Sequence, residues 1–579
     1  MAGQKEQGHW LDKYATNHAA WKIETDAQSG EQRFRRPLGL VETSFDIDGA
    51  CYGGRADVTA LFTLAIRHTL SKGQLRQRIA TAWTSLCLQH PLLMSRIIED
   101  QSTSHPHFAI NIPQSTETAT QNVEKSIVFM EDSYPTVDGN ELYHHAYNVA
   151  RIIEPKERLS RLHVLPLTPL SNGTLQLCFL IVIAHQISDG LSAYNWFSHF
   201  THILNLPASQ IETDIHRCRM AEEMRKKLPA AQEDLYPPIA GNKARQRWFW
   251  VLIRVLRHVK ATLPPTFENP LRREKRLEEA LPLEPKFDKV FDYRLESRPP
   301  MSCGHISASL SPPASSRFLS LCRSANVSIG AGCFALAGLA MMSMHESRYP
   351  HIPDAQRRAF TAAFPLNPRA FFANPPAADS CMLAFSEGIV MPFLPSRLPV
   401  EGRFKLVAKH ANRELRVYQK RLKRKTAKEG VVAGLDKHAP GRLLATGYVA
   451  QMELVEAKLP PGRRTASYGN PQGELPRSAS AFGATCAVSS IGPLAAFLKR
   501  GMYDISELGE GRDFAADFWD TKIGVRARDN EFLVGSSTSS EGIVGFGVSY
   551  DLNAISEEAA ELWKGTIEGL LEESVVAKL

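Results

Sequence analysis

The chain has 579 residues, of which 43% are hydrophobic and 22% are charged. These values are typical of a globular protein with a large core and exclude an intrinsically disordered chain. Lysine and arginine exceed aspartate and glutamate by only seven charges, so the composition does not favour a nucleic acid partner. The nine cysteines are scattered and contain no CxxC pair, so we expect neither a disulfide framework nor a bound metal.

The sequence predicts no membrane span and no secretion. The apolar run 175–184 stops at His185, short of the roughly 20 residues that a spanning helix needs, and the first thirty residues lack an apolar signal segment. The last residues, Ala577-Lys578-Leu579, are a conservative variant of the terminal Ser-Lys-Leu peroxisomal signal. Two interpretations stay open: a cytoplasmic protein whose last helix frays, or a peroxisomal protein whose tripeptide binds the import receptor.

The first elements in chain order are a strand over 38–47, a turn-rich stretch through Gly53-Gly54, and a helix. The apolar residues of this helix, between Leu75 and Leu86, follow helical spacing. His90-Pro91 ends the helix because proline disfavours the helical conformation of the residue before it. The composition of 98–159 is polar, which predicts loops and short strands.

A buried strand and a helix follow. The run LQLCFLIVIA over 175–184 is typical of a strand that is buried on both faces. It ends at His185, and a helix is predicted over 191–204. A histidine between a central strand and a helix lies where α/β folds place their chemistry.

The segment 206–300 is charged and rich in proline, and we interpret it as an insertion that connects two lobes. Its one apolar island, 247–258, has two interpretations. A helix could dock Trp248, Trp250 and Leu252 on the protein while its arginines stay in solvent. Alternatively, a basic helix with an aromatic face could lie on a membrane surface.

The second half alternates strands and helices. We expect helices over 316–324, 328–344 and 556–572, and strands over 305–310, 358–366, 382–391, 485–491, 522–528, 532–538 and 543–550. This order predicts an α/β fold with mixed sheets flanked by helices. The predicted units are an N-terminal lobe (1–205), the connecting insertion (206–300) and a C-terminal lobe (301–579).

The chain contains a single HxxxD motif, His185 to Asp189, with Gly190 directly after it. Histidine, with an ordinary pKa near about 6.5, is the natural general base at neutral pH. The alternative is a core histidine, which the polar turn of Ser188, Asp189 and Gly190 makes less natural. The motifs of P-loop, dinucleotide-binding, serine hydrolase and zinc protease sites are absent from the sequence.

At these residues the chain resembles the superfamily of chloramphenicol acetyltransferase, the BAHD plant acyltransferases and the condensation domains of nonribosomal peptide synthetases. Their signature is HxxxDG after a hydrophobic strand. Further segments are similar in the same order: 90–96, 162–167, 364–369, 488–492 and 545–552. Segments 36–42 and 53–57 and the long middle look most like fungal acetyltransferases of the trichothecene 15-O-acetyltransferase type. The DFGWG segment of BAHD enzymes is not present, so plant-type substrates are less expected.

The resemblance implies a two-lobed chloramphenicol-acetyltransferase-like fold with an active-site tunnel between the lobes. In such a site His185 would take the proton of a substrate hydroxyl while the oxygen attacks the thioester carbonyl of acyl-CoA. Asp189 would pair with an arginine, assigned here to Arg369, and hold the turn. Gly190 would leave room for ligand.

Ser489 and Ser490 are the candidate donors to the oxyanion, because they lie on a segment similar to the S-N-x-G strand of the superfamily. The asparagine of that pattern is Ser490 in this sequence. A basic run over 416–428 has two interpretations: contacts with the CoA phosphates or a solvated helix face. Its candidate phosphate-binding residues are Lys420, Arg421, Lys423 and Arg424.

The resemblance therefore predicts an acyl-CoA-dependent O-acyltransferase that transfers an acetyl group to a hydroxyl of a fungal secondary metabolite such as a sesquiterpenoid. It implies acetyl-CoA or another acyl-CoA as co-substrate, a hydroxylated small molecule as acceptor, no bound cofactor, and a monomer. Two alternatives stay open. One is a condensation-domain-like enzyme with an acyl donor on a carrier protein; the other is a noncatalytic relative that binds a metabolite.

Overall fold

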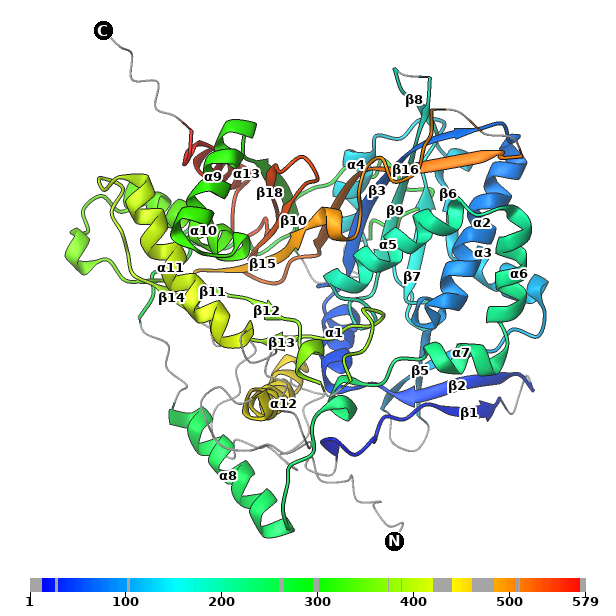
Figure 1. The fold of residues 1–579 in the computed structure, drawn as a ribbon, viewed down its shortest axis with the longest axis horizontal. Helices are drawn as coiled ribbons and strands as arrows, with labels where there is room; N and C mark the ends of the chain where they lie inside the picture. The colour runs from blue at the N-terminus through cyan, green and yellow to red at the C-terminus, as the bar shows by residue number, and fades with distance from the viewer. Residues whose placement is uncertain are drawn as a thin grey trace.

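Two large mixed sheets form the frame of the protein (Figure 1). The computed structural model describes residues 13–26, 30–100, 105–171, 173–259, 265–294, 301–372, 374–386, 388–419, 440–460, 484–506, 508 and 511–572. The first sheet contains, in spatial order, β16 (Phe514–Val525), β3 (Val58–His68), β9 (Leu175–Ile183), β7 (Ser160–Val164) and β6 (Ile127–Phe129), and β8 (Thr168–Pro169) also pairs with β9. The second contains β10 (Cys303–Ser309), β18 (Val544–Asp551), β17 (Phe532–Thr538), β15 (Cys486–Pro493), β11 (Phe360–Ala363) and β14 (Ile389–Met391).

The first sheet carries the N-terminal core. β9 pairs antiparallel with β3 and β7, so it is a central strand, and its side chains from Leu177 onward are buried. The helices around this sheet are α2 (Lys72–Gln89), α3 (Thr116–Glu124), α4 (Gly139–Asn148), α5 (Gly190–Leu204), α6 (Ala208–Cys218) and α7 (Ala221–Lys227). A smaller sheet lies beside them: β1 (Lys22–Thr25), β2 (Gln32–Pro37), β5 (Pro106–Asn111) and β4 (Arg96–Glu99).

The second sheet is covered by helices from the C-terminal half. These are α9 (Pro312–Ala325), α10 (Ile329–Arg348), α11 (Val400–Gln419) and α13 (Glu557–Gly569). Within the described part of the chain, α10 is the one helix long and apolar enough to cross a membrane, and 78% of its apolar window is buried inside the protein. Buried core helices can have the same length and apolar composition as a membrane-spanning helix.

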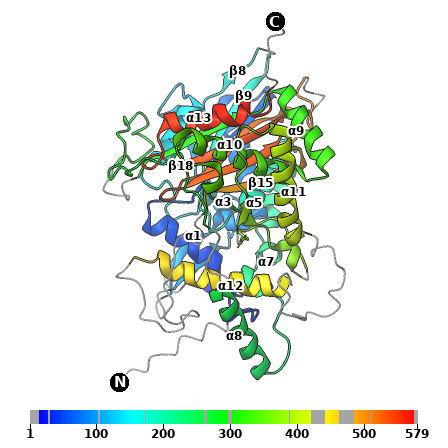
Figure 2. The ribbon, with the colours of Figure 1, turned by 90° about the vertical axis from the view of Figure 1, so that its left-hand side faces the viewer.

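Short elements complete the fold. A two-stranded sheet is formed by β12 (Pro365–Leu366) and β13 (Ala384–Phe385), and single 3₁₀ turns are η2 (Pro91–Met94), η3 (Met130–Asp132), η4 (Gln232–Leu235), η6 (Asp354–Gln356), η7 (Arg369–Phe371) and η9 (Leu494–Ala496). Two further helices, α8 (Lys243–Val259) and α12 (Pro440–Lys458), pack on each other at the lower end of the molecule in Figure 2.

Strand β16 ties the two halves of the chain together. It follows the second-sheet strand β15 in the sequence, yet it pairs antiparallel with β3 of the first sheet from Val525 to Phe514, with a bulge between Phe518 and Asp520. The division into 1–205, 206–300 and 301–579 stays a prediction, and this strand shows that sheet membership does not follow the order of the chain.

The strand predicted over 38–47 is wrong, because this segment forms helix α1 (Leu40–Cys51). Glu42 accepts a hydrogen bond from the backbone N–H of Gly39 at 2.7 Å, which caps the first turn. Glu42 also pairs with the buried Arg36 at 2.6 Å. Val41 and Phe45 then lie one turn apart on the buried face, so a helix buries the same apolar residues that suggested a strand.

The helical island is confirmed as α8, but its docking face differs from the predicted one. Phe249, Trp250 and Ile253 are buried against α12, while Trp248 is 62% exposed. The predicted set of 248, 250 and 252 has a spacing of two residues, which suits a strand; one face of a helix needs a spacing of three or four. The helices α3, α4, α6, α7, α11 and α12 and the central strand β3 were not predicted.

Candidate active site

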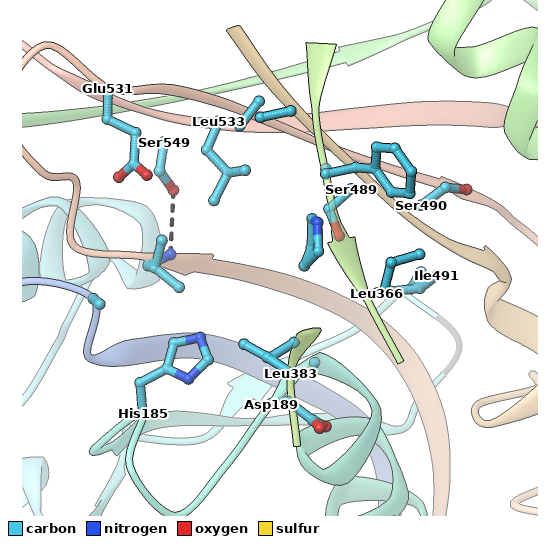
Figure 3. A pocket seen from close by; sticks show the side chains of 18 of the residues that line it. His185, Asp189, Leu366, Leu383, Ser489, Ser490, Ile491, Glu531, Leu533 and Ser549 are labelled. Carbon is cyan, nitrogen blue, oxygen red and sulfur yellow. Dashed lines mark hydrogen bonds between the residues drawn. The ribbon is translucent and has the colours of Figure 1, made fainter. Parts of the chain in front are cut away.

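A cavity of about 2150 Å³ lies between the two sheets, and the residues of the HxxxDG motif line it. Its walls come from the β9–α5 turn, from α1 and α12, and from strands of the second sheet. Figure 3 shows His185 and Asp189 on one side of the cavity and Ser489 and Ser490 on the other. His185, Asp189 and Gly190 therefore share one cavity with Ser489 and Ser490.

The turn between β9 and α5 is held by reciprocal capping. Asp189 is the N-cap of α5: its Oδ1 accepts a hydrogen bond from the backbone N–H of Ser192 at 2.9 Å. The hydroxyl of Ser192 in turn accepts one from the backbone N–H of Asp189 at 2.8 Å. These bonds satisfy amide groups at the helix start, so the sequence of the turn itself sets where α5 begins.

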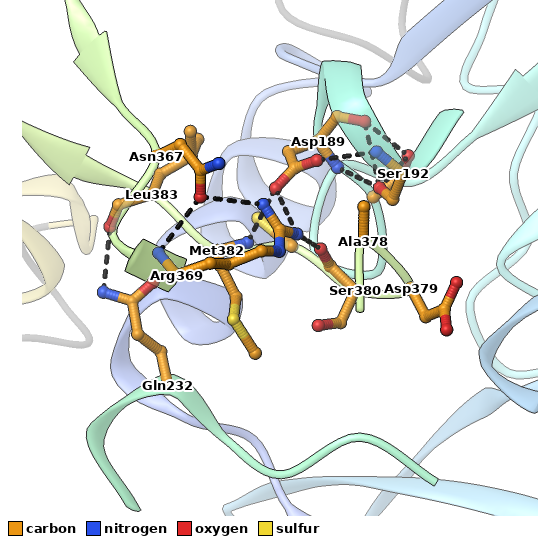
Figure 4. A network of polar contacts seen from close by, with 12 residues as sticks. Asp189, Ser192, Gln232, Asn367, Arg369, Ala378, Asp379, Ser380, Met382 and Leu383 are labelled. Atoms are coloured by element: carbon orange, nitrogen blue, oxygen red, sulfur yellow. Dashed lines mark hydrogen bonds and ion pairs between the residues drawn. The ribbon is translucent and has the colours of Figure 1, made fainter. Parts of the chain in front are cut away.

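The second carboxylate oxygen of Asp189 binds the C-terminal half of the chain (Figure 4). Arg369 Nη2 donates to it at 2.7 Å, and both side chains are buried. Arg369 also donates to the carbonyl of Ser380 at 2.6 Å, and the backbone N–H of Met382 donates to Asp189 Oδ2 at 3.1 Å. We call residues 378–382 the strap. The structure thus joins the two residues that the resemblance pairs and uses them to fasten the strap to the turn.

His185 is held between an aromatic ring and the strap. Its imidazole stacks on Phe45, with ring centroids 3.8 Å apart and planes inclined by 2°. Its Nδ1 lies 3.7 Å from the thiol sulfur of Cys381. Burial, assisted by the positive charge of Arg528, lowers the pKa of His185 to about 4. The imidazole is therefore neutral at pH 7, which is the form that accepts a proton.

The two candidate oxyanion donors lie on different faces of β15. Ser490 Oγ would lie only 3.5 Å from a Cβ built on Gly330, so it faces α10. Neighbouring strand residues point to opposite faces, so Ser489 points away from α10. The two hydroxyls point in different directions in Figure 3. The adjacent Ile491 would be 3.9 Å from a Cβ on Gly190. The end of β15 therefore lies against the start of α5.

Sequence reasoning missed one wall of the site. Phe45 and Asp48 on α1, Lys458 on α12, and Arg528 after β16 all line the cavity. Their segments are hundreds of residues apart, and no motif in the chain connects them. The only local signal was the helical spacing of Val41 and Phe45, which the predicted strand concealed.

Several predicted residues lie outside the described part of the chain. These are Lys420, Arg421, Lys423 and Arg424 of the basic run and the terminal Ala577-Lys578-Leu579. Contacts with CoA phosphates and with an import receptor therefore remain predictions. In the ranges that the structure describes, no group of three or more histidine, cysteine, aspartate or glutamate side chains could hold a metal ion.

No protein-family model matches the chain, and no curated protein matches it. Solved structures do. TRI3 trichothecene 15-O-acetyltransferase from Fusarium sporotrichioides superposes with a TM-score of 0.62 at 11% identity, over 95% of this chain and 97% of that one. The first condensation domain of the calcium-dependent antibiotic synthetase superposes with a TM-score of 0.50 at 11% identity, over 93% and 97% of the two chains.

Identity this low shows the fold and not the reaction. The superpositions extend over nearly the whole of both chains, so the likeness in fold is not confined to one half of the protein. The protein has the two-lobed fold of the chloramphenicol acetyltransferase type, which it shares with TRI3 trichothecene 15-O-acetyltransferase and with the first condensation domain of the calcium-dependent antibiotic synthetase.

Proposed function

We propose that the protein is an acyl-CoA-dependent O-acyltransferase that acetylates a hydroxyl of a small hydrophobic metabolite such as a sesquiterpenoid. The observation that carries the proposal is His185: a neutral imidazole at the end of a central strand, facing a large cavity, on a turn fixed by Asp189 and Arg369. The likeness in fold to a trichothecene 15-O-acetyltransferase supports the acyl group and the acceptor class.

The proposed reaction uses these groups as follows. As the acceptor oxygen attacks the thioester carbonyl, its proton passes to the neutral imidazole of His185. The carbonyl oxygen becomes an oxyanion, and the hydroxyl of Ser489 is the donor assigned to it. Collapse of this intermediate breaks the C–S bond, and the imidazolium returns the proton to the CoA sulfur. Asp189 has no part in proton transfer because Arg369, Met382 and Ser192 occupy its carboxylate.

The size of the cavity favours direct transfer. Pockets for single drug-sized ligands have volumes of about 300–1,000 Å³. A cavity of about 2150 Å³ offers room for the ends of two substrates at the same time. Holding both reactants in one complex supplies much of the rate enhancement by proximity and needs no acyl-enzyme.

A thiol-release assay with acetyl-CoA and a panel of hydroxylated sesquiterpenoids tests the proposal. His185→Ala should lower turnover by about 10²–10⁴-fold, because general base catalysis contributes that much. The matched control is His345→Ala: His345 is also buried with a pKa lowered to about 4, but it lies outside the cavity wall. A near wild-type rate in folded His185→Ala contradicts the mechanism.

The same purified chain distinguishes the two other interpretations. Acyl transfer from a loaded carrier protein, detected by mass spectrometry and absent with free acyl-CoA, would indicate a condensation-domain-like enzyme. Tight binding of acyl-CoA or metabolite without thiol release would indicate a noncatalytic relative. Either result overturns the acyl-CoA proposal.

A further inference from the structure

Phe45 makes the closest ring contact with the candidate base, although no motif contains it. It projects from α1, is only 4% exposed, and lies parallel to the imidazole of His185 at 3.8 Å between centroids. Parallel stacking at this distance leaves no space for water between the rings. It also fixes the plane of the imidazole, because rotation about the side-chain bonds of His185 would drive the ring into Phe45.

A cluster of charged side chains lies beside Phe45. Asp48, one turn further along α1, accepts hydrogen bonds from Lys458 Nζ at 2.6 Å and from Arg528 Nη2 at 2.8 Å. Arg528 also pairs with Glu531 at 3.3 Å. The Lys458 ammonium and the Arg528 guanidinium carbon each lie 5.6 Å from the centroid of the Phe45 ring. We call Asp48, Lys458, Arg528 and Glu531 the ionic cluster.

The cluster contains two cations and two carboxylates, so its formal charge is zero. This balance matters because His185 becomes a cation during the proposed reaction. An uncompensated positive charge beside it would oppose that step, whereas the face of Phe45 favours a nearby cation. The charged groups that act on His185 are Arg528, Asp189 and Asp48, and Cys381 touches it from the strap.

Three distant segments of the chain hold this arrangement in place. α1 is anchored at its start by the buried pair of Arg36 and Glu42. The end of α12 is anchored to α1 by Lys458, which also donates to the hydroxyl of Ser44 at 2.9 Å. Arg528 brings the turn after β16 to the same carboxylate. The ring of Phe45 therefore has little freedom to move away from His185.

We propose that Phe45 is a positioning residue for His185, and that the ionic cluster holds Phe45 in place and sets the electrostatic environment of the imidazole. This inference rests on the proposed role of His185 as a base. It assigns a role in the site to Phe45 and the ionic cluster, which lie outside the HxxxDG motif.

The first test removes the ring and keeps an apolar side chain. Phe45→Leu should lower kcat by about 10- to 100-fold, because small misplacements of a catalytic group cost this much, while KM for acetyl-CoA changes less than about 2-fold. Phe45→Tyr, which keeps an aromatic face, should restore most of kcat. The matched control, Phe318→Leu, alters a buried ring of α9 that does not line the cavity and should leave kcat unchanged.

The second test changes charge and leaves the ring in place. The positive charge of Arg528 lowers the pKa of His185, so Arg528→Gln should move the acidic limb of the kcat/KM profile to higher pH. Arg55→Gln is the control: Arg55 also lines the cavity but pairs with Asp529 at 3.0 Å, and its removal should not move the limb. An unchanged profile in Arg528→Gln overturns the role of the cluster.

A readout without substrate separates this inference from the proposed function. Diethyl pyrocarbonate modifies neutral histidine. The rate at which it modifies His185, followed by peptide mass spectrometry as a function of pH, therefore reports the protonation state of this imidazole. If no form of the protein releases thiol but Arg528→Gln shifts the labelling profile, the function fails and the role of the cluster stands. If wild type turns over while Phe45→Leu retains kcat, the positioning role fails and the function stands.

Discussion

Two walls meet at His185, and they are built in different ways. The β9–α5 turn is continuous in sequence, and its strand, histidine, capping aspartate and helix follow one another within 30 residues of chain, 175–204. The wall of α1 and α12 is assembled from Phe45, Lys458 and Arg528, which reach the site from three separate segments. One wall can be found as a pattern, and the other exists only after folding.

The two walls differ in the number of cations that pair with their buried carboxylates. Among the residues that the structure describes, Asp189 pairs with one cation, Arg369, whereas Asp48 pairs with both Lys458 and Arg528. Loss of one cation leaves Asp48 with another, but loss of charge at Asp189 leaves Arg369 buried without a carboxylate. The two walls should therefore differ in their sensitivity to single substitutions.

The largest effect on stability is expected from Asp189→Asn. Asparagine caps a helix as well as aspartate, so the substitution removes charge and leaves the cap. Breaking a buried ion pair on one side costs about 3–5 kcal/mol, measurable as the free energy of unfolding in urea. Asp132→Asn is the control, since its pair with Arg76 at 2.7 Å is exposed and worth less than about 1 kcal/mol. Equal losses of unfolding free energy in both variants would contradict a stabilising buried ion pair between Asp189 and Arg369.

A smaller effect is expected from Lys458→Met. Asp48 retains Arg528 in this variant, so the loss should come from the hydrogen bonds that Lys458 donates to Asp48 and to Ser44. The charged bond to Asp48 should account for most of it, about 1.5–3 kcal/mol in the same unfolding measurement. A loss as large as that of Asp189→Asn would show that the second cation does not compensate.

Lys458→Met should also change how the unfolding free energy depends on pH. Burial lowers the pKa of Lys458 to about 8, whereas an unfolded lysine titrates near about 10.4. Between these values the unfolded chain holds a proton that the folded protein has released, so this group makes the unfolding free energy of wild type rise with pH. The rise from about pH 8 to 10.4 should be weaker in Lys458→Met; identical slopes contradict the lowered pKa.

The smallest effect on stability is expected from Gly190→Ala, which probes the turn itself. The added methyl would meet only Ile491 at 3.9 Å, so stability should change by less than about 0.5 kcal/mol. The methyl lies in the cavity, and kcat/KM should fall by about 10-fold, as for one misfitting methylene. Gly402→Ala on α11, with nothing within 4 Å of the new atom, should change neither quantity. Full activity in Gly190→Ala would place the substrates elsewhere.

Much of the fold was predictable because burial leaves a local pattern. α2, β9, α5 and α10 follow their apolar spacing, and His90-Pro91 ends α2 as expected. The segment 38–47 was not, because its apolar residues fit a strand or a helix equally well. Capping by Glu42 and its pairing with Arg36, which lies in the preceding strand, decide for the helix.

By itself, the sequence determined the histidine, its capping aspartate and the strand and helix that carry them. The strand leaves a continuous apolar run in the sequence, and the capping bonds of Asp189 join it to Ser192, only three positions away. Through the resemblance the sequence also indicated Arg369. Only the tertiary structure decided which serine faces away from α10, how Phe45 stacks on His185, and that Lys458 and Arg528 share Asp48. These contacts join residues that are up to 480 positions apart, and no local spacing encodes a contact of that range.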